Sequence, residues 1–291
     1  MINLKNLFKI LLAIIMISTQ AYAVDCESDM CPSVPQKING PVSSVLSKVT
    51  GMNWILSSVI ESQVKKQMDK ALLGDFKVNI TPYGGKSLLD GKFKKMTAHS
   101  DYSYIEGLYL SDVNAESVCE YNHFIYKDGQ VYTNENFILS YSVSVTSDDL
   151  QKTVATPQYL KLLNSMKVSV GNISVFKIFD PKAEIKNNRM VFSLKVISPL
   201  TLGEPKRIST DMGLEVEDGK IMFTDVRTTP NLTSVNLNSI LPVINKLNPF
   251  VYKANIMNNS KSIIKVQNVN INDNKIVITG LVIVPKNYYN N

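Results

Sequence analysis

Apolar residues recur at steps of three and four along the stretch from Met52 to Leu73, and polar residues fill the positions between them. This spacing places the apolar side chains on one face of a helix for several turns. Gly74 follows the last apolar residue, at a position where a left-handed residue often ends a helix. The pattern predicts one long amphipathic helix over residues 52–73.

After Gly74 the period changes to two, which predicts strands with one buried face. Tight turns are expected at Asp128-Gly129, Asn187-Asn188 and Asp218-Gly219, and a bulge near Gln267-Asn268. The predicted strands are 76–81, 92–104, 108–121, 124–127, 130–134, 137–145, 168–179, 183–185, 191–197, 208–217, 220–227, 262–271 and 275–284.

Two further segments have helical spacing. Residues 146–164 begin with Thr146 followed three positions later by Asp149, a start of the capping-box kind, and Pro157 should kink this helix or divide it in two. The other segment is 232–247. Together the patterns predict an α+β fold in which a strongly curved, mostly antiparallel sheet wraps around the long amphipathic helix, with two further helices.

The N-terminus is typical of an export signal. Lys5 and Lys9 precede an apolar run, and Ala21-Tyr22-Ala23 has the small residues of a cleavage site. We expect a signal peptide at 1–23, an N-terminal arm or linker at 24–50, a domain at 51–286 and a tail at 287–291. The expected location is the periplasm or another extracytoplasmic part of the cell envelope; an uncleaved anchor is the alternative.

Charge and cysteines add little that is specific. Removing residues 1–23 takes away two lysines and no acid, so the formal charge falls from +6 to +4, too small an excess to indicate nucleic acid. Cys26 and Cys31 bracket a short loop, and in an exported chain they could form a disulfide. Cys119 would then have no cysteine partner.

The usual catalytic motifs are absent from the sequence. His99 and His123 stand alone, so no metal site is expected, and the acids at turns are explained by turn geometry. We therefore expect no catalytic residue, no cofactor and no enzymatic activity. A carboxylate-dependent hydrolase acting on envelope lipids is kept as a distant alternative.

Several short motifs carry a family resemblance. Its residues are Phe76-x-Val78-x-Ile80, Ser87-Leu88-Leu89-Asp90-Gly91-Lys92-Phe93, Gly107-Leu108-Tyr109-Leu110-x-x-Val113, Thr146-x-x-Asp149-Leu150, Asn248-Pro249-Phe250 and Ile276-Val277-Ile278-Thr279-Gly280. Over residues 52–285 the chain resembles the bacterial LmeA-like phospholipid-binding family. The resemblance implies a tubular-lipid-binding (TULIP-like) fold with a lipid between helix and sheet, and no catalytic residue. Pro157 departs from the family pattern.

The function expected from this resemblance is exported phospholipid binding, for lipid carriage or presentation, with peripheral membrane contact and no nucleic acid. The lipid-lining residues would be Ile55, Leu56, Val59, Ile60, Val64, Met68, Val78, Ile80 and Phe93. Lys86, Lys92, Lys94 and Lys95 would contact anionic head groups. Two alternatives stay open: the apolar residues form a closed core in a structural or interaction module of the envelope, and the lysines are a solvated strand face.

Overall fold

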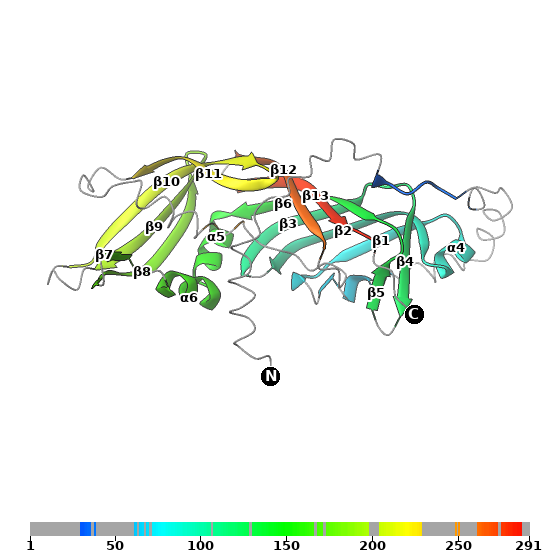
Figure 1. Cartoon of the computed structure of the whole chain (residues 1–291), viewed down its shortest axis with the longest axis horizontal. Coiled ribbons are helices and arrows are strands. Elements are labelled where there is room, and N and C mark those ends of the chain that lie inside the picture. The colour runs from blue at the N-terminus through cyan, green and yellow to red at the C-terminus, as the bar shows by residue number, and fades with distance from the viewer. Residues whose placement is uncertain are drawn as a thin grey trace. The chain divides into compact units, whose positions relative to one another are not determined.

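A computed structural model describes the chain at residues 30–35, 38, 61–62, 64–66, 68–69, 72–105, 107–127, 130–165, 168–170, 173–197, 204–228, 248, 250, 261–272 and 275–286. The described residues are mostly antiparallel strands arranged in two sheets (Figure 1). The signal peptide, most of the predicted arm, the predicted helix at 232–247 and the tail at 287–291 lie outside the described residues.

The larger sheet has eight strands in the order β12-β13-β6-β3-β2-β4-β5, with β1 paired to β2. The C-terminal hairpin therefore returns to pair with β6, which lies more than a hundred residues earlier in the chain. The strands are β1 (Lys77–Pro82), β2 (Lys92–Ile105), β3 (Leu108–Ser117), β4 (Asn122–Lys127), β5 (Gln130–Thr133), β6 (Phe137–Thr146), β12 (Ile263–Asn272) and β13 (Lys275–Val284).

The smaller sheet is a meander in which each strand pairs with the next. Asn187 and Asn188 at one turn, and Asp218 and Gly219 at another, all have positive φ, as two-residue hairpin turns require. These two predicted turns are confirmed, whereas the predicted turn at Asp128-Gly129 lies outside the described residues. The strands are β7 (Val168–Val170), β8 (Ile173–Lys186), β9 (Arg189–Ile197), β10 (Lys206–Glu217) and β11 (Lys220–Thr228).

The residues at the N-termini of the short helices explain where these helices begin. In α5 (Ser147–Val154) the hydroxyl of Thr146 accepts from the backbone of Asp149, whose carboxylate accepts from the Thr146 N–H. Pro157 begins α6 (Pro157–Ser165), so the predicted helix is divided in two, as expected. The Thr156 hydroxyl accepts from the Tyr159 N–H at 3.2 Å and caps the second helix.

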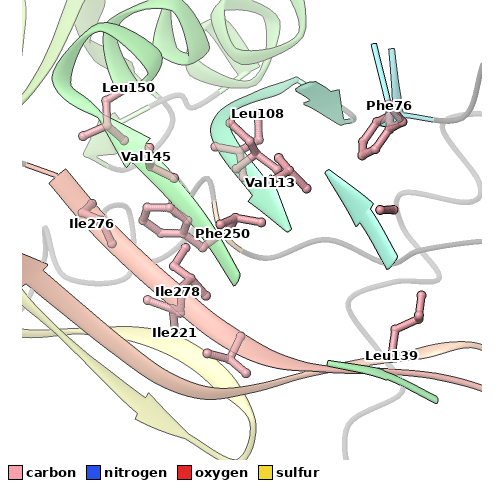
Figure 2. Close-up of a cluster of buried hydrophobic side chains, with 14 of the residues drawn as sticks. Phe76, Leu108, Val113, Leu139, Val145, Leu150, Ile221, Phe250, Ile276 and Ile278 are labelled. Carbon is pink, nitrogen blue, oxygen red and sulfur yellow. The ribbon is translucent and has the colours of Figure 1, made fainter. Parts of the chain in front are cut away.

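Buried side chains from both sheets and α5 form a continuous core. Phe250 lies beside Val145 of β6 and Ile278 of β13, with Ile221 of β11 nearby (Figure 2). Asn248 holds this part of the chain, since its side-chain amide donates to the Ile221 carbonyl at 2.9 Å and its oxygen accepts from the Phe250 N–H at 3.0 Å. The core therefore joins residues far apart in the sequence.

The two sheets are also linked by hydrogen bonds. The predicted bulge in β12 is confirmed by a register shift between Val266 and Asn268, and the Val266 N–H donates to the Gly219 carbonyl of the β10–β11 turn at 2.9 Å. From α5, the Ser147 hydroxyl accepts from the Ile185 N–H and the Gln151 side chain accepts from the Ala183 N–H of β8.

The predicted fold class is wrong in its organising element. Among the described residues the helices are short, no long amphipathic helix is present, and the sheets are not strongly curled. Residues 52–60 lie outside the described residues, and the described helical positions of that stretch fall between Glu61 and Leu72. The ladder of β6 and β13 runs without a register shift, whereas the ladder of β3 and β6 is shifted between Ser111 and Asn114.

Two described residues of this helical stretch, Glu61 and Asp69, bind the backbone within β1 or just before it. The carboxylate of Glu61 accepts from the Ile80 N–H at 2.7 Å, and that of Asp69 accepts from the Phe76 N–H at 2.8 Å. Eight helical residues rise about 12 Å and four extended residues about 13 Å, so the two carboxylates reach two backbone N–H groups that lie four residues apart.

Candidate functional site

The predicted lipid-lining residues that the structure describes belong to the buried hydrophobic cluster or pack against it. Val64, Val78, Ile80 and Phe93 are buried, and Met68 is partly buried against them. The Phe93 ring packs at 4.9 Å from the ring of Phe124. Ile55, Leu56, Val59 and Ile60 lie outside the described residues. Burial of these side chains is common to a packed core and to a lipid-lined seam, so their lipid-lining role stays a prediction.

The four predicted head-group lysines lie at one place, around α4 (Gly85–Leu89) and the start of β2. Lys86, Lys94 and Lys95 are exposed and Lys92 is half-buried. Lys95 forms an ion pair with Glu116 at 2.5 Å, and Lys92 lies 3.9 Å from Asp90. Their role in contacting head groups stays a prediction.

The disulfide predicted between Cys26 and Cys31 is replaced by another pairing. Cys31 is bonded to Cys119, with 5.4 Å between the Cα atoms and a sequence separation of 88; Cys26 lies outside the described residues. The short spacing of Cys26 and Cys31 suggested a local bridge, but the fold brings Cys119, between β3 and β4, to the arm. No local signal in the sequence indicates this pairing.

The buried carboxylate of Asp149 has a structural explanation. One oxygen accepts from the Thr146 N–H at 2.9 Å, from the Thr146 hydroxyl at 2.7 Å and from the Ser111 hydroxyl at 2.7 Å. These donors hold it at the junction of β6, α5 and β3. A carboxylate so fully engaged is a cap rather than a general base.

The two histidines have opposite environments. Asn134 donates from its side-chain amide to Nδ1 of His123 at 3.0 Å, and burial, followed by the charge of Lys92, lowers the pKa of His123. The ring nitrogens of His99 face Asn114 at 2.8 Å and Asp101 at 3.0 Å, and these hydrogen bonds raise the pKa of His99.

The five-stranded sheet has one apolar and one charged face. The cross-strand pairs Phe192–Thr210, Leu194–Ile208 and Leu214–Phe223 share the first face, and the Tyr159 ring of α6 covers its middle, 6.4 Å from the Phe192 ring. Towards both ends the apolar side chains are only partly buried. These are Leu194, Val196, Ile208, Leu214, Val216 and Phe223, here called the apolar face residues.

The opposite face carries an ion-pair network over a shallow hollow. Arg189 donates to Asp211 at 2.6 Å and to Asp225 at 3.0 Å, and Arg227 also pairs with Asp225. The hydrogen bond from Arg227 contributes most to lowering the pKa of Asp225. The hollow is lined by these arginines, Asp211 and Lys186 among others, and its carboxylates already pair with its guanidinium groups.

Comparison with models of protein families, with curated proteins and with solved structures finds no match for this chain. The described side chains contain no group of three histidine, cysteine or acidic residues that could hold a metal ion. Among the helices that the structure describes, none has the length and hydropathy of a membrane span. The two-faced sheet and the lysine cluster are therefore the candidate sites.

Proposed function

We propose that this protein is exported to the cell envelope and binds the acyl chains of a phospholipid on the apolar face of the five-stranded sheet. This site consists of the half-buried apolar face residues. It differs from the seam between helix and sheet, around Val78 and Phe93, that the sequence predicts. The observation that carries it is the continuity of this face, which runs from the buried Phe192 to partly exposed side chains at both ends.

The dimensions of this face suit hydrocarbon. From Ile208 to Val216 the strand extends about 26 Å at the usual rise per residue, whereas an acyl chain in one leaflet spans about 15 Å, half the hydrocarbon thickness of a bilayer. Each buried methylene contributes roughly 0.8 kcal/mol, so even part of one chain would be held firmly. The face is therefore long enough for a lipid tail.

Export is supported by two independent features. Residues 1–23 have the charge and hydrophobicity pattern of a cleaved signal, and the Cys31–Cys119 disulfide is compatible with an oxidising compartment. A phospholipid carrier in the envelope would meet its ligand there.

A structural or interaction module without a ligand is the second candidate. It is favoured by the burial of Val64, Val78, Ile80 and Phe93. In such a module the half-buried apolar face residues would contact a partner protein or other parts of this chain.

Native mass spectrometry of gently purified mature protein separates the two candidates. We expect a lipid-sized adduct that is lost in the double variant Leu194→Asn/Ile208→Asn, a directly paired couple on the apolar face. The matched control is Ser193→Asn/Ser209→Asn, the adjacent pair on the charged face, which should retain the adduct. Circular dichroism verifies that both variants fold. Wild-type protein without an adduct, or equal adducts in both variants, would reject lipid binding at this face.

A further inference from the structure

The second candidate site is the segment from Gly85 to Lys95, here called the α4 tip. Leu88 is completely buried, whereas the next residue, Leu89, is 67% exposed. Lys86 stands three positions before Leu89, so their side chains share one side of the short helix. The tip therefore presents an apolar and a cationic side chain together.

A β-bulge in the same segment exposes two adjacent lysines. Thr81 pairs with Lys95 and Pro82 with Phe93, so the β1–β2 register skips Lys94. Phe93 stays buried while Lys94 and Lys95 are both exposed. Regular alternation would have turned one of these two lysines towards the core.

The tip is strongly positive. It contains four lysines and the single acid Asp90, and within the described part of the chain neither Lys86 nor Lys94 has an ion-pair partner. Such a local excess attracts an anionic surface, whereas the whole chain is only mildly basic.

The backbone holds the tip in one conformation. Gly91 has φ +73, and a Cβ atom there would lie 1.9 Å from the Phe124 carbonyl oxygen. The Phe124 N–H donates to the Gly91 carbonyl at 2.8 Å, and the Gly91 N–H donates to the Leu88 carbonyl at 2.9 Å. With Leu88 buried beneath it, Leu89 stays directed outward.

We propose that the α4 tip docks this protein on an anionic bilayer surface, with Leu89 entering the head-group region and Lys86 and Lys94 contacting lipid phosphates. A lone exposed leucine is ordinary on a protein surface. An exposed leucine in one short segment with Lys86 and Lys94, which have no ion-pair partner in the described structure, suits the apolar interior and the negative charge of such a membrane. This proposal is independent of an acyl chain on the five-stranded sheet.

Vesicle flotation tests the docking surface with the full mature chain. Vesicles of phosphatidylcholine alone are compared with vesicles that also contain phosphatidylglycerol. We expect binding only to the second kind, and weaker binding as salt rises. Each lysine near an anionic surface is worth about a fivefold change in partitioning, so Lys86→Glu/Lys94→Glu should lose more than about 25-fold. Leu89→Ser should lose about tenfold or more through lost apolar burial.

Two controls match the change in charge and in apolar area. Lys182→Glu/Lys186→Glu alters two exposed lysines of β8, and Leu73→Ser alters another exposed leucine. Both should float like wild type. Wild type that fails to float, or a tip variant that floats as well as its control, overturns the proposal. Because the adduct measured by native mass spectrometry does not involve the tip, loss of one result with retention of the other shows which proposal fails.

Discussion

Removing the disulfide gives the sharpest test of the fold, because the sequence and the structure favour different pairs. Cys31→Ala and Cys119→Ala each break the bond seen in the structure, whereas Cys26→Ala leaves it intact. If Cys26 instead paired with Cys31, the Cys26 variant would be destabilised and the Cys119 variant would keep its disulfide.

The magnitude follows from the length of the closed loop. A separation of 88 residues corresponds to about 4.5 kcal/mol of lost entropy in the unfolded chain. This is a large part of the roughly 5–15 kcal/mol by which a domain is stable. For a domain of this size the melting temperature should fall by roughly 10–15 °C. A Cys26–Cys31 loop would give a much smaller effect.

Urea unfolding followed by circular dichroism measures this cost. Cys31→Ala, Cys119→Ala and the double variant should lose nearly the same free energy of unfolding, because all three lack one bond. Cys119 is buried, so its replacement also removes packing, and repeating each measurement with a thiol reductant isolates that part. Under reductant the wild type should match Cys31→Ala. A destabilised Cys26→Ala with an unaffected Cys119→Ala would refute the reasoning, and peptide mapping without reduction identifies the bonded pair directly.

Three further variants or titrations test local features by urea or thermal unfolding. Asp149→Ala should cost about 2–4 kcal/mol because it leaves buried donors unpaired, whereas Asp148→Ala, at an exposed ion pair, should cost at most about 0.5 kcal/mol; equal costs would contradict the capping role. The lowered pKa of His123 contributes stability above pH about 6.5 that is lost as pH falls through the folded pKa, and the raised pKa of His99 contributes stability that is lost as pH rises above 6.5. NMR titration should give one imidazole on each side of that value, and two values on the same side would be inconsistent with these environments. Gly91→Ala should cost about 2 kcal/mol or more, since a carbonyl must move and φ is positive; an unchanged melting temperature would contradict the close approach.

The sequence predicts the local elements well because their determinants lie within a few residues. Asp218-Gly219 adopts the expected turn, Thr146 and Asp149 form the expected cap, and Pro157 divides its helix. Each depends on the conformational preference of one or two residues. Such preferences act independently of the rest of the fold.

Long-range features are not predicted, because local periodicity does not indicate which distant part of the chain a residue contacts. The apolar stripe around Val64 indicates that one face is buried, but it does not indicate which strands lie against that face. Cys119 carries no signal for Cys31, since 88 residues of intervening fold bring them together. The lysine cluster was visible as a run of charges, whereas the bulge that exposes both Lys94 and Lys95 is a property of pairing with β1.

The carboxylates of Glu61 and Asp69 along β1, with the side chains of Ser147 and Gln151 along β8, have a consequence for behaviour at high concentration. Unpaired N–H groups on an outer strand are a template on which another copy can add a strand and begin a fibril. Here several of those groups already donate to the protein's own side chains. Intermolecular strand addition at these positions would first have to displace these acceptors, so the native fold itself resists aggregation there.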